Sequence, residues 1–179
     1  MRYEDILLFW FVECTNKRRW AKDRTFDAMV KRRFESIYEA ARAGELSHWR
    51  AGIRGRMAEI ILLDQFSRNM FRDTARAFES DAMALVLAQE ALGTGLLMTL
   101  KPEERSFAVM PYMHSESRLV QAQSVKVFEA LELEENLSFA IRHKEIIDQF
   151  DRFPHRNAIL NRRSTPEEIE FLAQPGSSF

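Results

Sequence analysis

Glycine and proline are absent from three long stretches of the chain, residues 1–43, 56–92 and 112–153. These two residues are the usual interruptions of a helix, so stretches of this length without them favour helices. No sustained alternation of apolar and polar residues indicates a strand, and no Asn-Gly pair indicates a hairpin. The sequence therefore predicts an all-α fold.

Apolar spacing and capping residues predict about seven helices. Between Asp23, a typical N-cap, and Gly44, a typical stop, apolar residues recur at the spacing of one helical face. The final helix has the clearest start, because Thr165-Pro166-Glu167-Glu168 combines an N-cap, a first-turn proline and a capping-box acid. The other helices are expected over residues 54–69, 80–91, 102–110, 115–131 and 136–150. Such helices can form a bundle or a superhelix of antiparallel pairs.

Length and composition exclude several classes of protein. The 179 residues suit one domain, so residues 1–179 are expected to form a single domain. A hydrophobic content of 46% excludes intrinsic disorder. The 26 Lys and Arg residues nearly balance the 27 Asp and Glu residues, which removes the general electrostatic argument for a nucleic-acid or membrane partner. The most apolar run, residues 6–12, is too short to cross a bilayer.

Cysteine and histidine usage argues against a metal site. The single Cys14 cannot form a disulfide framework or a cysteine-rich metal site, and it fits a reducing cytoplasm. The four histidines (His48, His114, His143 and His155) lack the close spacing of metal ligands. We therefore expect no metal and no cofactor, and a cytoplasmic location.

The helix over residues 54–69 is apolar around most of its circumference, which predicts a central position in the core. Asp64, Arg68 and Arg72 follow one another at i, i+4 and i+8 on this otherwise apolar surface. One interpretation is a buried ion pair between Asp64 and Arg68. The alternative is an anion-binding site that uses Arg72, the arginine left over once Asp64 is neutralised.

The helix over residues 136–150 carries a histidine on its apolar face. His143 lies between Phe139 and Ile146, Ile147 and Phe150, with Arg142 at the flank of that face. Its ring is therefore expected to point into the core or into a cavity beside the core.

A cluster of polar residues follows this helix. Arg152, His155, Arg156 and Asn157 surround a proline in a connecting segment, where polar side chains are available to bind a ligand. The structural alternative is that these arginines bond to free carbonyls at helix ends and fix the segment.

Candidate catalytic residues are His114, Glu116 and His143. A histidine near neutral pH is a suitable general acid or base, and Glu116 is its possible orienting partner. His114-Ser115-Glu116 matches half of the zinc deaminase signature, but the half P-C-x-x-C is missing. An enzyme built from these residues is therefore expected to be metal-independent.

A basic stretch lies near the start of the chain. Residues 17–33 contain eight Lys and Arg residues and two acidic residues, with Trp20 and Phe26 between them. Such a face is compatible with nucleic-acid binding. An exposed helix face balanced by acidic residues elsewhere is the favoured interpretation, so a nucleic-acid partner is not expected.

Several motifs together resemble one bacterial family. They are Phe9-Trp10-Phe11, Trp20 with Lys22-Asp23, Phe26-Asp27, Ile60-Ile61-Leu62-Leu63-Asp64-Gln65-Phe66, Arg68-Asn69, Ala77-Phe78, Met113-His114-Ser115-Glu116, Arg152-Phe153-Pro154-His155-Arg156-Asn157, Ser164-Thr165-Pro166-Glu167-Glu168 and Gly176-Ser177-Ser178-Phe179. Over essentially its whole length, the chain resembles the uncharacterised domain of unknown function 924. The resemblance implies a tetratricopeptide-like superhelix of antiparallel helix pairs with a concave inner surface, and it implies no established activity.

Family members usually have glycine at the positions of Asp151 and Asn161. Asp and Asn are the residues after glycine that best tolerate a left-handed backbone, so turns are expected to persist at both positions.

The functional prediction is a binding module for an anionic small molecule or an acidic peptide. Its groove is expected to use Asp64, Arg68, Arg72, Arg142, Arg152, His155, Arg156 and Asn157. The alternative is an enzyme that acts on a small anionic substrate with a histidine as general acid or base. The sequence carries no signal for the oligomeric state.

Overall fold

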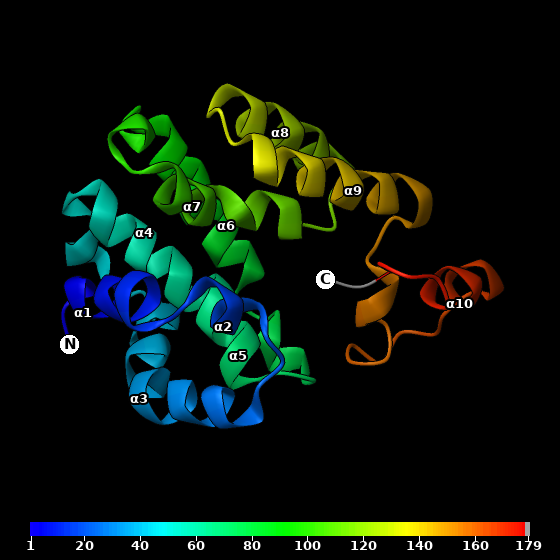
Figure 1. Cartoon of the computed structure of the whole chain (residues 1–179), viewed down its shortest axis with the longest axis horizontal. Helices are drawn as coiled ribbons and strands as arrows, with labels where there is room; N and C mark the ends of the chain where they lie inside the picture. Colours follow the sequence, from blue (N-terminus) through cyan, green and yellow to red (C-terminus); the bar gives the residue numbers. More distant parts are fainter. Residues whose placement is uncertain (178–179) are drawn as a thin grey trace.

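The computed structural model describes residues 1–177, and every regular element among them is a helix (Figure 1). The α-helices are α1 (Tyr3–Leu8), α2 (Asn16–Trp20), α3 (Arg24–Arg42), α4 (Ile53–Ile61), α5 (Ser67–Met70), α6 (Asp81–Gly93), α7 (Pro102–His114), α8 (Arg118–Ala130), α9 (Glu134–Phe150) and α10 (Pro166–Leu172). Short 3-10 turns cover Ser47–Ala51, Ala75–Ala77, Leu97–Thr99 and Pro154–Arg156, and π-helical turns cover Phe9–Glu13 and Leu62–Phe66. The all-α prediction is confirmed.

Local capping explains where two of the helices begin. The Asp23 carboxylate accepts hydrogen bonds from the backbone amides of Thr25 and Phe26 at the start of α3. At the start of α10, Thr165 and Glu168 exchange side-chain and backbone hydrogen bonds in a capping box. Both N-caps are those that the sequence predicts.

Three other boundaries differ from the sequence prediction. The Ser80 hydroxyl bonds to the Tyr38 hydroxyl at 3.0 Å and makes no cap bond to α6. Ser117, not Ser115, caps α8, and α9 begins at Glu134, two residues before the expected start at Asn136. At Ser80, the hydroxyl bonds to a tertiary partner instead of the helix end.

The central position expected for the helix over residues 54–69 is confirmed. Helix α4, the π-helical turn and α5 run without a break over residues 53–70, and every residue of the turn is buried. The Phe66 ring lies 5.6 Å from Phe9, 4.8 Å from Phe34 and 5.4 Å from Trp10, measured between ring centroids. This aromatic cluster joins the N-terminal helices to the central helix.

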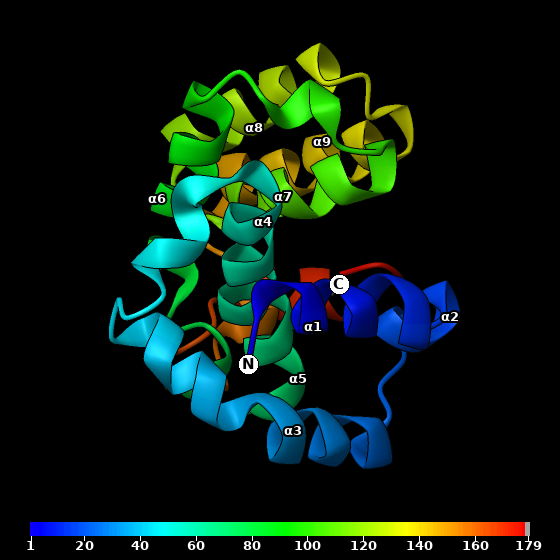
Figure 2. The ribbon, with the colours of Figure 1, turned by 90° about the vertical axis from the view of Figure 1, so that its left-hand side faces the viewer.

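Neighbouring helices pack as antiparallel pairs on both sides of the central helix. Helices α6 to α9 lie on one side of α4, and α1 to α3 lie on the other (Figure 2). Helix α8 turns directly into α9, and the two pack along each other. The antiparallel packing of helices is thus confirmed, and the tetratricopeptide-like superhelix stays a prediction.

The segment after α9 folds back toward the central helix. Residues 151–165 leave the end of α9 and lead through the Pro154–Arg156 turn to α10 (Figure 1). Asp151 (φ 58°) and Asn161 (φ 53°) both adopt the expected left-handed backbone. These turns place the short Pro154–Arg156 turn opposite the central helix.

Among the described residues, no helix combines the length and the apolarity that a membrane span requires.

Candidate functional site

A cavity of about 1140 Å³ lies between α2, α5, α7, α9 and the Pro154–Arg156 turn. Its lining contains seven of the residues singled out from the sequence: Arg68, Arg72, His114, Arg142, His143, His155 and Arg156. The lining also contains apolar side chains from α2, α7 and α9. Residues scattered over nearly 90 positions of the chain therefore line one space.

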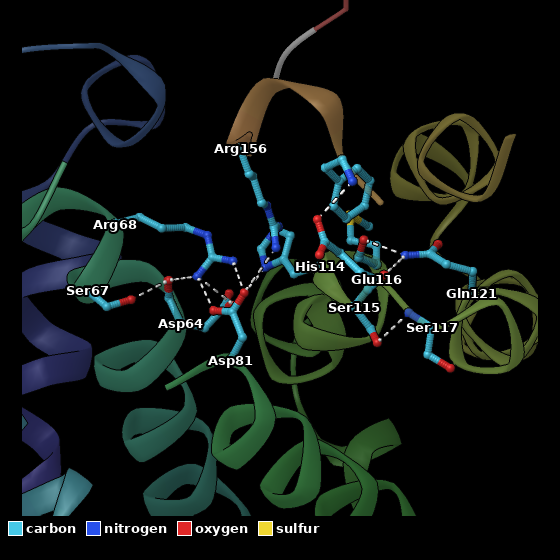
Figure 3. A network of polar contacts seen from close by, with 12 residues as sticks. Asp64, Ser67, Arg68, Asp81, His114, Ser115, Glu116, Ser117, Gln121 and Arg156 are labelled. Atoms are coloured by element: carbon cyan, nitrogen blue, oxygen red, sulfur yellow. Dashed lines mark hydrogen bonds and ion pairs between the residues drawn. The ribbon is translucent and has the colours of Figure 1, made fainter. Parts of the chain in front are cut away.

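Asp64 is the buried centre of the polar network beside this cavity (Figure 3). The residue has 0% exposure, and its carboxylate lies 2.6 Å from Nδ1 of His114, 2.6 Å from Nε2 of Gln65 and 3.2 Å from Nη1 of Arg68. Burial opposes ionisation, but His114, Arg68 and the hydrogen bonds outweigh it, so the pKa of Asp64 lies below its ordinary value. The predicted Asp64–Arg68 ion pair is therefore present.

Asp81, the first residue of α6, joins two arginines. Its carboxylate accepts hydrogen bonds from Nη1 and Nη2 of Arg68 at 2.9 and 3.0 Å, and from Nη1 of Arg156 at 3.4 Å. Arg68 and Arg156 come from α5 and from the Pro154–Arg156 turn, and both point toward Asp81 (Figure 3). The two guanidinium groups therefore share one carboxylate.

Arg156 is a buried cation with weak compensation. Only 6% of the residue is exposed, and its guanidinium carbon lies 4.5 and 4.6 Å from the ring centres of Phe78 and Phe153. Its hydrogen bond to Asp81 is longer than is usual for a charge-assisted bond, and its Nε has no partner within residues 1–177. Burial and the neighbouring Arg68 lower the pKa of Arg156 to about 10, which leaves it charged at neutral pH.

His114, the last residue of α7, is oriented by Asp64. A carboxylate only accepts hydrogen bonds, so a neutral ring must carry its proton on Nδ1 and its lone pair on Nε2. Burial lowers the pKa of His114, and Asp64 only partly opposes this effect, so the neutral form is favoured near pH 7. Within the part of the chain that the structure describes, Nε2 has no hydrogen-bond partner.

Two more histidines lie beside His114. The His143 ring is 6.2 Å from the His114 ring, and its Nδ1 bonds to the backbone oxygen of Phe139 at 2.7 Å. Burial, and next His114, lower the pKa of His143 to about 3, whereas burial and Arg156 lower that of His155 to about 4. His143 is thus both a buried histidine and part of a cavity wall.

Glu116 does not orient His114. Its carboxylate accepts two hydrogen bonds from Arg162, at 2.6 and 2.9 Å, and one from the backbone amide of Phe153 at 2.8 Å. Glu116 therefore fixes the segment that carries Arg156. Asp64, and not Glu116, is the carboxylate that orients His114.

Arg72 is not left over as a free cation. It binds the Asp27 carboxylate through Nε and Nη2, at 2.5 and 2.9 Å, and Asn69 donates to the same carboxylate. The expected helical stripe fails here because α5 ends at Met70, so Arg72 lies beyond the helix. The lightly compensated arginine at the cavity is Arg156.

Arg152 and Asn157 hold the connecting segment together. Arg152 binds both oxygens of Glu168 at 2.6 and 2.8 Å and lowers the pKa of that carboxyl to about 2, and Asn157 donates to Glu168 and to Ser164. Neither side chain lines the cavity. Arg152 and Asn157 therefore fix the connecting segment, which is the structural alternative given above. His155 and Arg156 of the same segment line the cavity.

Arg142 and the basic stretch near the start of the chain both have partners in the structure. Arg142 lines the cavity and donates to the backbone oxygen of Gly176 at 3.2 Å. In the basic stretch, Arg19 is buried and pairs with Glu103, and Arg33 pairs with Glu13. Within residues 1–177, no group of three or more His, Cys, Asp or Glu residues has the arrangement to hold a metal ion.

Comparison with known proteins agrees with the motifs. A family described as "Bacterial protein of unknown function (DUF924)" matches residues 6–176. The chain belongs to this family. A solved structure of a protein of unknown function from Agrobacterium tumefaciens is 35% identical, covers 96% of each chain and has a TM-score of 0.90. Among curated proteins, none matches the chain.

Three residues of the site in this DUF924 chain were not among the candidates chosen from the sequence. Asp81 looked like an ordinary acidic residue in the first turn of a helix, and Gln65 and Phe78 appeared only within the family motifs. Asp81 and Phe78 join the site through contacts with Arg156, and Gln65 joins it through Asp64 and Met110. Asp64 and Arg68 were detectable because charges on an apolar helix are unusual.

Proposed function

We propose that the chain binds a small anionic molecule in the cavity, with Arg156 and Arg68 as its anion-binding groups. The observation that carries this proposal is the buried Arg156 guanidinium, which has one long hydrogen bond to a carboxylate already occupied by Arg68. A buried cation is usually paired, and a bound carboxylate or phosphate supplies the missing acceptors. His114 and His155 offer further polar contacts in the same wall.

The cavity favours a small molecule over an acidic peptide. Its volume of about 1140 Å³ is slightly above the usual range for small-molecule sites, about 300–1,000 Å³. Several of its wall residues are buried, among them Met110, Met113 and His143. The location of the protein in a reducing cytoplasm, inferred from its single cysteine, belongs to the same proposal.

Arg156→Gln is expected to weaken the binding of small anions by about tenfold to a hundredfold, because charge-assisted hydrogen bonds contribute about 1.5–3 kcal/mol. Isothermal titration with phosphate, succinate and an acidic hexapeptide measures the effect, and circular dichroism checks the fold of the variant. Arg163→Gln is the matched control, since Arg163 is an exposed arginine of the same segment outside the cavity lining. Equal affinities in the wild type and Arg156→Gln contradict the proposal, and binding of the peptide alone favours a peptide partner.

The second candidate function is a metal-independent enzyme with His114 as general base. The Asp64–His114 pair favours it, because the buried carboxylate fixes the ring with Nε2 free to accept a proton next to the proposed anion site. A substrate held by Arg156 and Arg68 would then lose a proton to Nε2, and the arginines would stabilise the negative charge that develops.

His114→Gln is expected to slow this chemistry by about a hundredfold to ten-thousandfold, the usual contribution of a general base. Proton spectra of 2-oxobutyrate, malonate and glycerol phosphate in D₂O, with and without the protein, report deuterium uptake and bond cleavage together. His48→Gln, which changes an exposed histidine outside the cavity, is the control. His114 is excluded as the base if the spectra of every probe that binds stay unchanged, or if the wild type and His114→Gln react at equal rates. Anion binding then remains as the function.

A further inference from the structure

We infer that the anion bound by this cavity carries an apolar body, so that the ligand is an amphipathic carboxylate or phosphate ester. This inference rests on the proposed anion site and adds the class of molecule. The lining of the cavity combines arginines and histidines with aromatic and methionine side chains. A simple inorganic anion would use only the charged and polar members of this lining.

The exposed aromatic residues support this assignment. Among the aromatic side chains of residues 1–177, only Trp20 (57%) and Phe139 (47%) are exposed, and both line this cavity. They come from two different helices, α2 and α9. Aromatic side chains gain stability from burial, and each can bury about 150–250 Å². Their shared position at one cavity indicates an apolar group between them.

Phe139 shows why this exposure is informative. Its position on the apolar face of α9 predicts a core residue, and three other members of that face, Ile146, Ile147 and Phe150, do pack into an apolar cluster. Seven residues before Ile146, about two turns toward the start of the helix, Phe139 lines the cavity. An apolar face that continues from the core into a cavity wall fits contact with an apolar part of a ligand.

Trp20 is held by contacts within the protein. Its ring stacks on Phe107, with centroids 5.9 Å apart and an interplanar angle of 13°, and its Nε1 donates to Asn16 at 2.8 Å. One ring contact and one hydrogen bond thus orient the indole, while 57% of the residue stays exposed. A rigid, half-exposed aromatic ring is suited to stacking with a planar or alkyl group.

Helix α7 contributes both His114 and apolar residues to the lining. From His114, the wall continues through Met110 to Phe107, seven residues earlier on the same helix. At about 1.5 Å per residue, His114 and Phe107 are about 10 Å apart along the helix. A medium-chain fatty acid or an arylalkanoate has this length and charge pattern.

A series of carboxylates tests the inference. Acetate, butanoate, hexanoate, octanoate and 3-phenylpropanoate are titrated into the wild-type protein by calorimetry. Affinity is expected to rise by about fourfold for each methylene group that becomes buried. Trp20→Ala and Phe139→Ala are expected to reduce this rise while the affinity for acetate stays unchanged, and Arg156→Gln is expected to weaken every member.

The controls separate the possible failures. Leu119→Ala removes an exposed apolar side chain (70% exposed) outside the cavity lining, and it should leave the series unchanged. If no carboxylate binds, the proposed anion site itself is wrong. If acetate and octanoate bind equally, or if the gain with chain length survives in Trp20→Ala and Phe139→Ala, the anion site stands and the apolar body is excluded. If Arg156→Gln binds every carboxylate as tightly as the wild type and still shows the rise in affinity with chain length, the carboxylates bind elsewhere on the protein. That result overturns the inference.

Discussion

Asp64→Ala is expected to reduce the free energy of unfolding by about 3–5 kcal/mol, because it leaves buried charge without compensation. The Asp64 carboxylate is fully buried and receives Arg68, His114 and Gln65. After its removal, the carboxylate left to Arg68 is Asp81, which Arg68 already shares with Arg156. Equilibrium unfolding in urea, compared with the wild type, measures the loss.

A surface carboxylate provides the control for Asp64. Asp148 pairs with Lys144 on the exposed face of α9, so Asp148→Ala should change the free energy of unfolding by less than about 1 kcal/mol. The double variant Asp64→Leu with Arg68→Met should lose less than the sum of the two single variants, since it removes both partners of the buried pair. A loss below about 1 kcal/mol in Asp64→Ala would show that the network does not stabilise the fold.

Acid is expected to destabilise the protein steeply between pH 6.5 and pH 5, before ordinary carboxylates titrate. An unfolded histidine has a pKa of about 6.5, whereas the folded protein holds His143 at a pKa of about 3 and His155 at about 4. The unfolded state therefore binds more protons in this range. The contribution of these histidines to the free energy of unfolding is fully present above pH 6.5. It falls as the pH drops, by up to about 1.4 kcal/mol per pH unit for each such histidine.

Urea unfolding at intervals from pH 7.5 to pH 5 measures this slope. His143→Asn keeps a donor near the backbone oxygen of Phe139 but cannot take up a proton, so the slope near pH 5 should decrease by about 1.4 kcal/mol per pH unit. His48→Asn, at an exposed position, should leave the slope as it is. A wild-type stability that stays constant down to pH 5 would show that the histidines are protonated in the folded protein.

Local chemistry made most of the fold predictable. The N-caps Asp23 and Thr165, the left-handed turns at Asp151 and Asn161, and the buried helix around Asp64 all depend on residues close together in the chain. Such features are set by backbone conformation and helical spacing, which a sequence records directly. Predictions failed where a helix end was decided by a tertiary partner, as at Ser80, which bonds to Tyr38.

The candidate site was only partly predictable. Seven of the candidate residues line one cavity, and the partners of some of them differ from those that the sequence suggested. A free Arg72 was one of two interpretations, and Arg72 instead lies beyond the end of α5 at Met70 and pairs with Asp27. Glu116 was expected beside His114, and it binds Arg162.

The sequence by itself determined the helical class, the main helix starts and the Asp64–Arg68 pair, because each depends on spacing within one helix or turn. Only the tertiary structure decided that Asp81 is shared by Arg68 and Arg156, residues that lie 13 and 75 positions away from it. The same holds for Trp20 and Phe139, which reach one cavity from α2 and α9. Contacts of this kind depend on how helices pack against one another, and helical spacing along the chain carries no record of that packing.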